Sequence, residues 1–235
     1  MTYEEVMAQL EAMGTEQTKR TFLRHGAKEP FFGVRIGDMK KLVKTVKKDQ
    51  PLARALYESG NSDAMYLAGL TVNPRELDKE TLRKWVRKAY WHMLAEYTVA
   101  WLAAESPHGH ELAIEWIEDP EELIAVCGWS TYANWLSLKP DEELNLEEIG
   151  RLLARIEATV HGERNYVRYV MNGFVIAVGV YVLPLQAEAR RVAEAIGAVS
   201  VNMGDTACKV PLAYAYIDKV EAMGKSGRKK KTCIC

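Results

Sequence analysis

The sequence predicts an all-α protein. Apolar residues recur at three- and four-residue spacing almost from end to end, and breaks rich in glycine or proline divide the chain into segments about one helix long. No window shows the sustained two-residue alternation that marks a half-buried strand. The run 175–182, rich in valine, is the strongest candidate for a strand. We predict helix there, because Val170, Phe174 and Val178 lie four residues apart on one face.

About ten to fourteen helices joined by tight loops suit either an irregular helical bundle or an α-solenoid. No clean repeat of about 40 residues decides between the two. A length of 235 residues suits one domain, which we predict over residues 1–224. Residues 225–235 form a basic C-terminal tail that we expect to be flexible.

Composition excludes several classes of protein. Hydrophobic content of 48% and charged content of 27% are those of a folded globular chain. The most apolar run, residues 173–185, is too short to cross a bilayer, so we expect no membrane and a cytoplasmic location. Four scattered cysteines without a CxxC pair predict reduced thiols and no metal site. No glycine-rich phosphate loop or dinucleotide fingerprint is present, so we expect neither a cofactor nor a bound nucleotide.

The stretch 31–42, which reads FFGVRIGDMKKL, is the most specific part of the chain. Gly33 and Gly37 allow a tight turn, and Asp38 suits the first turn of the helix that follows. That helix is amphipathic, because apolar residues recur on one face and lysines fill the others. The apolar set is Met39, Leu42, Val43 and Val46, and the lysines are Lys40, Lys41, Lys44, Lys47 and Lys48.

The net charge is only −1, but the charges are unevenly distributed along the chain. Residues 19–48 hold ten basic and two acidic side chains, a net charge of +8. We therefore predict a phosphate-facing surface there, with Arg35, Lys44 and Lys47 among its contacts.

A second basic helix is predicted over residues 78–90, where Arg83 and Arg87 share a stripe and become further candidate phosphate contacts. Residues 105–148 hold twelve acidic side chains and one lysine, a net charge of −11, and should avoid phosphates. Two other interpretations stay open. Each run is a solvated helix face, or the acidic and basic halves pair across an oligomer interface, and the sequence does not fix the oligomeric state.

The segment from Phe32 to Leu42 resembles the FGVR-x-x-D-L-x-K-L signature of the DNA alkylation repair family, the AlkC/AlkD-type proteins. The resemblance implies a HEAT-like helical-repeat solenoid whose concave surface holds duplex DNA. It also implies that some members excise alkylated bases as DNA glycosylases. The solenoid is therefore the expected architecture.

The resemblance further implies a helix of the form W-W-D-x-V-D near mid-chain. Its counterpart is predicted at residues 128–135, GWSTYANW, with Trp129, Tyr132 and Asn134 as candidate catalytic residues. A carboxylate in such a helix stabilises the developing oxocarbenium charge, and aromatic faces hold a cationic base. Residues 123–140 contain no Asp or Glu, and core packing is the competing interpretation for the aromatic residues.

The resemblance also points to Arg168, which corresponds to the family's arginine-bearing helix that approaches the DNA backbone. Asn165 and Asn172 share its face, either as a polar strip facing a groove of DNA or as a buried network that fixes helix register. Lys209, in the polar loop 204–211, is predicted to reach phosphate.

Three functions fit these observations. The first is a DNA glycosylase that excises cationic N3- or N7-alkylpurines, as the signature implies. The second is a non-catalytic binder of DNA, motivated by the missing carboxylate. The third is a helical scaffold for protein partners, motivated by the charge polarity. Duplex DNA is the expected partner, and the sequence leaves open whether the protein is an enzyme.

Overall fold

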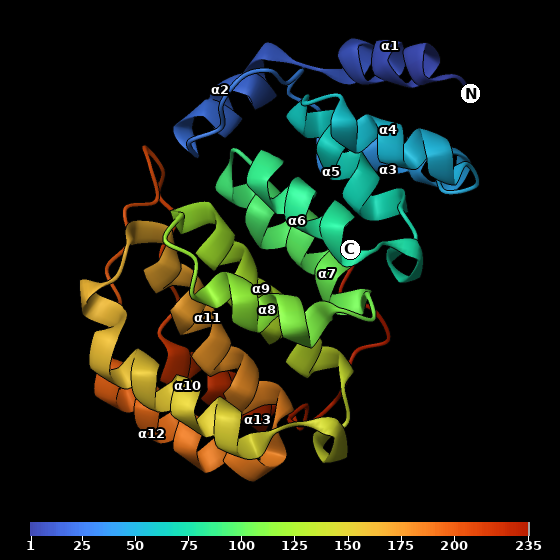
Figure 1. The fold of residues 1–235 in the computed structure, drawn as a ribbon. Helices are drawn as coiled ribbons and strands as arrows, with labels where there is room; N and C mark the ends of the chain where they lie inside the picture. Colours follow the sequence, from blue (N-terminus) through green and yellow to red (C-terminus); the bar gives the residue numbers. More distant parts are fainter. Residues whose placement is uncertain (235) are drawn as a thin grey trace.

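The chain folds into thirteen α-helices, and no β-strand occurs in residues 1–234, the part that the computed structural model describes (Figure 1). The α-helices are α1 (Tyr3–Met13), α2 (Glu16–Arg24), α3 (Ile36–Val46), α4 (Gln50–Glu58), α5 (Ser62–Thr71), α6 (Lys79–Lys88), α7 (Ala100–Glu105), α8 (Gly109–Ile117), α9 (Glu122–Leu138), α10 (Leu146–Thr159), α11 (Asn165–Tyr181), α12 (Gln186–Ile196) and α13 (Ala213–Ala222). A π-helix, η2 (Leu94–Val99), leads directly into α7. Single 3₁₀ turns are η1 (Pro74–Glu76), η3 (Asp141–Glu143), η4 (Val160–Gly162) and η5 (Leu183–Leu185). The all-α prediction is confirmed.

The helices form two layers that stack in chain order from α1 to α13 (Figure 1). The inner layer contains α3, α5, η2 with α7, α9 and α11, and each of these packs on the next. The outer layer contains α4, α6, α8, α10 and α12, and α4 and α8 each pack on the inner helix that follows. Pairs of helices that stack on neighbouring pairs make the predicted HEAT-like solenoid, not an irregular bundle.

Ion pairs join each outer helix to the next. Arg83 on α6 binds Glu115 on α8, with its Nε 2.9 Å from Oε1, and Arg155 on α10 binds Glu118, directly after α8. Arg191 on α12 binds Glu157 on α10 at 2.7 Å. These residue pairs are 32, 37 and 34 positions apart, which gives the repeat spacing that the sequence did not reveal. The basic helix α6 therefore pairs with the acidic run 105–148 within one chain. In the basic run 19–48, by contrast, the described ion pairs are only those of Lys19 with Glu29 and Lys41 with Asp38.

The signature segment is held by one buried carboxylate. Asp63, in the first turn of α5, accepts backbone N–H bonds from Phe32 at 2.6 Å, Gly33 at 2.9 Å and Val34 at 3.2 Å. Gly33 has a φ of 80°, and a Cβ there would lie 2.8 Å from the backbone nitrogen of Lys19. The turn therefore requires glycine, and the Phe-Gly-Val sequence docks α3 against the N-terminus of α5.

The C-terminal tail is packed, so its predicted flexibility is wrong for residues 225–234. Backbone N–H groups of Gly227 and Lys230 donate to carbonyl oxygens of α11 and α9, each at 2.7 Å. The Lys229 ammonium lies 2.8 Å from Asp141, and the N–H of Cys233 donates to Glu105 at 2.7 Å. The chain end thus returns to the middle of the molecule beside α7 (Figure 1). Cys235 lies outside the described residues.

Residues 197–212, named here the crossing segment, run from α12 across the N-terminal end of α11 to α2. Asn165 and Asn202 exchange two hydrogen bonds, of 2.7 and 2.8 Å, and the Asp205 N–H donates to the Arg24 carbonyl at 3.1 Å. Asn172 donates to the Pro211 carbonyl at 3.0 Å. The crossing segment therefore borders the N-terminal ends of the inner helices, and the tail borders their C-terminal ends.

Helix α11 is a core helix, as predicted for residues 175–182. Val170, Phe174 and Val178 are buried along one face. Within residues 1–234 no single helix is long and apolar enough to cross a membrane. Only α11 taken together with Leu183–Ile196 passes that test, and this pair is bent by 114°.

Candidate nucleic-acid interface

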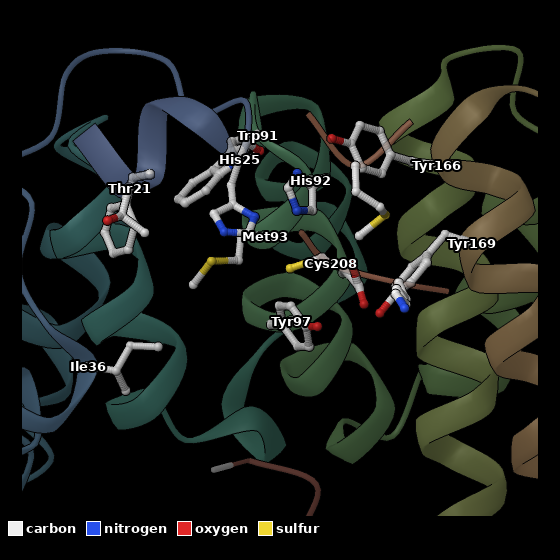
Figure 2. A pocket seen from close by; sticks show the side chains of 14 residues that line it. Thr21, His25, Ile36, Trp91, His92, Met93, Tyr97, Tyr166, Tyr169 and Cys208 are labelled. Carbon is white, nitrogen blue, oxygen red and sulfur yellow. Dashed lines mark hydrogen bonds between the residues drawn. The ribbon is translucent and has the colours of Figure 1, made fainter. Parts of the chain in front are cut away.

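A cavity of about 440 Å³ opens on the inner layer between α2, α3, η2, α11 and the crossing segment (Figure 2). We call it the aromatic pocket. Its lining residues are Thr21, Phe22, His25, Ile36, Trp91, His92, Met93, Glu96, Tyr97, Tyr166, Tyr169, Met203, Cys208 and Lys209. A volume of this size lies in the range of small-ligand sites, about 300–1,000 Å³.

Aromatic rings from two inner helices face each other in this pocket (Figure 2). His92 stacks on Tyr166 with ring centroids 4.4 Å apart and planes within 10°. Trp91 is buried behind them, where its indole N–H donates to the His25 carbonyl at 3.2 Å. Tyr97 and Tyr169 are half-buried, so part of each ring remains accessible. These surfaces suit stacking with a flat ligand.

Glu96 is the acidic side chain of the aromatic pocket. Burial raises the pKa of its carboxyl to about 7, and the neighbouring Tyr97 hydroxyl offsets only part of that effect. Burial and the Glu96 charge in turn raise the pKa of Tyr97 and bring that of Tyr169 to about 12. A carboxyl that titrates near neutrality inside a cavity is typical of a functional site.

His92 is held in its neutral form. Burial, together with the nearby His25, lowers the pKa of His92 to about 4. A neutral imidazole stacks on Tyr166 without bringing a second cation into the pocket. Across residues 1–234 no group of three or more His, Cys, Asp or Glu side chains could hold a metal ion. The pocket therefore offers a carboxyl and aromatic rings, with Lys209 at its rim.

Two further cavities continue along the inner layer. A cavity of about 380 Å³ shares Glu96, Tyr97 and Tyr169 with the aromatic pocket and extends to Asn134 on α9. A third, of about 680 Å³, lies between α3, η1, α7 and the tail. Together the three cavities span the inner layer from the crossing segment to the tail.

The candidate catalytic helix of residues 128–135 is placed differently from what we predicted. Trp129 and Tyr132 have no exposed surface, and both rings pack edge-on against Phe174 in the core. The Tyr132 hydroxyl donates to Glu148. These two residues cannot touch a bound strand, because α9 turns them toward α11 and α10. Asn134 lines the second cavity described above, together with Ser130 and Ala133, and its amide donates to the Ser130 carbonyl at 2.9 Å.

Sequence reasoning missed Trp91 and Glu96. They provide, on one short stretch, the tryptophan and carboxylate that the resemblance led us to seek at residues 128–135. The signal was a single carboxylate within an otherwise uncharged run, residues 93–104. The π-helix η2 begins within this stretch, and such one-residue expansions of a helix are frequent at functional sites.

The predicted phosphate contacts divide between the inner and outer surfaces. Lys209 lines the aromatic pocket, Lys47 lines the third cavity, and exposed Arg35 directly precedes the pocket residue Ile36. Lys44 is exposed on α3 beside Lys47. Ile36, Lys40, Val43 and Lys47 fall on one stripe of α3 that faces the cavities.

The three other predicted arginines are less accessible to a DNA phosphate on the inner surface than we predicted. Arg83 is bound to Glu80 and Glu115 on the outer layer, so its charge is already neutralised. Arg87 is exposed on the same outer helix, away from the cavities. Arg168 is half-buried, with Nη2 3.4 Å from the Asn165 Oδ1 and a buried Nε that has no hydrogen-bond partner. Its neighbour Asn172 is buried and holds the crossing segment, so the polar strip is largely a structural network.

Comparisons with known proteins agree with this fold. A family model described as DNA alkylation repair enzyme matches residues 6–186. Two uncharacterized proteins, Lmo0209 from Listeria monocytogenes and Lin0241 from Listeria innocua, are each 35% identical over 225 residues, which cover 93% of this chain and 97% of theirs.

A solved structure is similar over 100% of both chains, with a TM-score of 0.90 and 34% identity. It represents a new family of proteins related to the HEAT-like repeat DNA glycosylases with affinity for branched DNA structures. The match covers the inner helices, the crossing segment and the tail alike. On the family-model match and the two relatives of near-equal length, this chain belongs to the DNA alkylation repair enzyme family.

Proposed function

We propose that this protein binds branched DNA and stacks nucleotides left unpaired at the branch point in the aromatic pocket. The observation that carries the proposal is the pocket itself, about 440 Å³ with accessible rings from η2 and α11. Such a cavity admits a base that has left its stack, whereas an intact duplex is too wide to enter. Base stacking on aromatic side chains tolerates any sequence, because every base has a π-face.

The distribution of free charge supports the same proposal. Outer-layer cations such as Arg83, Arg155 and Arg191 are matched by carboxylates. Lys40, Lys47 and Lys209, which face or border the inner cavities, have no ion pair within residues 1–234. Phosphates are therefore attracted to the inner surface, and binding should weaken steeply with salt. The proposal is also supported by the similar solved structure, which represents proteins with affinity for branched DNA structures.

Substitution of Tyr169 by leucine tests the pocket. We expect the affinity for a four-way junction to fall by about 5- to 150-fold, because one stacked base contributes about 1–3 kcal/mol. Fluorescence anisotropy with labelled junction DNA measures this change. The matched control is Tyr216→Leu, since Tyr216 is 46% exposed on α13 and lines none of the three cavities. Equal affinities of the two variants would show that the pocket does not hold a base.

Excision of cationic alkylpurines is a second candidate, favoured by Glu96 among aromatic rings. An ionised carboxylate at Glu96 stabilises a cationic transition state. Residues 128–135 contain no Asp or Glu that could do the same. The test is release of 7-methylguanine from duplex DNA by the parent protein and by Glu96→Gln. Release that disappears in the variant establishes an enzyme, and no release by the parent leaves a binding protein. A cytoplasmic location stays a prediction.

A further inference from the structure

The third cavity, named here the distal groove, lies at the opposite edge of the inner layer from the aromatic pocket. The residues that matter for its chemistry are Lys47, Asn73, Arg75, Glu105, Thr232 and Ile234. Its volume of about 680 Å³ exceeds that of the aromatic pocket, and its walls come from α3, η1, the end of α7 and the tail. The binding of one base in the aromatic pocket assigns no role to the distal groove.

The acidic groups of the distal groove are already occupied. The Glu105 carboxylate accepts a hydrogen bond from the Thr232 hydroxyl and N–H bonds from Cys233 at 2.7 Å and Ile234 at 3.3 Å. Glu76 lies 3.7 Å from the Arg54 guanidinium and accepts from the Asn73 amide. The neutral donors hold the Glu105 carboxylate against the tail without cancelling its charge, whereas Glu76 has a cationic partner in Arg54.

The basic groups of the distal groove are not occupied. Lys47 and Arg75 are exposed, and neither side chain makes a hydrogen bond or ion pair with any residue in 1–234. Lys44, Lys48 and Lys231 are exposed near them along the chain and also have no ion pair in that part of the protein. These five unpaired cations outnumber Glu105, the one carboxylate among the described groove residues without a cationic partner, so the groove carries an excess of positive charge, which is the chemistry that binds a phosphate backbone.

The aromatic pocket and the distal groove lie at opposite ends of α3, and this separation decides which DNA can reach both. Ile36 begins α3 and lines the aromatic pocket, and Lys47, eleven residues later and directly after the last residue of α3, lines the distal groove. At 1.5 Å per residue that is about 16 Å along the helix axis. The stack of inner helices runs across this direction, so a duplex that follows the stack beside the pocket does not point toward the distal groove. A second duplex that diverges from the first at a branch point does point toward the distal groove.

We propose that the distal groove binds the sugar-phosphate backbone of a second arm of branched DNA, through Lys47 and Arg75, while the branch point lies at the aromatic pocket. This inference rests on the proposed function. Duplex DNA has one negative charge for about every 1.7 Å of its axis, so an arm that crosses the groove meets both cations. Preference for branched DNA then comes from two sites that a single straight duplex does not fill together.

The test is the double substitution Lys47→Gln and Arg75→Gln. We expect affinity for a four-way junction to fall by about 10- to 30-fold near 0.15 M salt, and the slope of log affinity against log salt to become shallower by about 2. Affinity for a linear duplex should change less than about two-fold. The matched control is Arg87→Gln with Lys219→Gln, which removes the same charge from exposed positions outside the groove.

Three outcomes would contradict the inference or its basis. An equal loss for junction and linear duplex would mean that one duplex spans both edges of the inner layer. An unchanged junction affinity would mean that the distal groove does not touch DNA. A parent protein that binds neither DNA would overturn the proposed function itself. Far-ultraviolet circular dichroism and thermal melting confirm that each variant is folded.

Discussion

Replacement of Asp63 by alanine should lower the free energy of unfolding by about 3–5 kcal/mol, because three buried N–H donors lose their acceptor and each unsatisfied donor costs about 1–3 kcal/mol. Asp63 is 3% exposed and holds three successive N–H groups of residues 32–34. Without the carboxylate these donors stay buried and unsatisfied, since alanine leaves no acceptor and little room for water. Residues 32–34 then lose the only side-chain hydrogen bonds that they have among the described residues.

Chemical denaturation followed by circular dichroism measures that loss. Asp78→Ala is the control, because Asp78 caps α6 through one N–H bond, from Thr81 at 2.7 Å, at an exposed position. Loss of such a cap costs about 1 kcal/mol. A loss of the same size at Asp63 would show that the signature segment is held by packing alone.

The Glu96→Gln variant should be more stable than the parent at alkaline pH and equal to it at acid pH. The pKa of Glu96 is about 7 in the folded protein, above its ordinary value of 4.5. Between these values the folded protein keeps a proton that the unfolded chain has released, so the free energy of unfolding falls as pH rises from 4.5 to 7. The full difference, up to about 3 kcal/mol, is present above pH 7. Glutamine has the same shape but no charge to bury.

Thermal melting of both proteins at pH 5 and pH 8 tests this. His92 acts in the opposite direction, because its lowered pKa makes stability fall as pH drops from about 6.5 to 4. His92 is present in both proteins, so the difference between them isolates Glu96. A difference that is the same at both pH values would mean that Glu96 is not a buried, titrating carboxyl.

The helical class and the turn before α3 could be predicted because both are local. Periodic apolar residues give the helices, including α11, whose valine-rich end resembled a strand. The turn depends on Gly33, whose positive φ is a property of that single residue. The family resemblance supplied the solenoid, which the spacing of residues alone did not decide.

The site could not be predicted in the same way, because it depends on which helices become neighbours. Arg83 looked like a phosphate contact until Glu115, 32 residues later, was found beside it. Trp129 was a candidate catalytic residue with core packing as the competing interpretation, and its burial against Phe174 of α11 agrees with core packing. We predicted a flexible tail because the residue that anchors it, Glu105, lies 128 positions before Cys233 and could not be identified from the local sequence. Long-range pairing of this kind leaves no trace in local spacing.

The most direct test of the proposed function compares the affinity of the parent protein for a four-way junction and for a linear duplex of equal length and sequence. Titrations at several salt concentrations give both affinity and salt slope. We expect the junction to bind at least about ten-fold more tightly near 0.15 M salt, with the steeper slope that extra phosphate contacts produce. Equal affinities for the two DNAs, or no binding of either, would contradict the proposal.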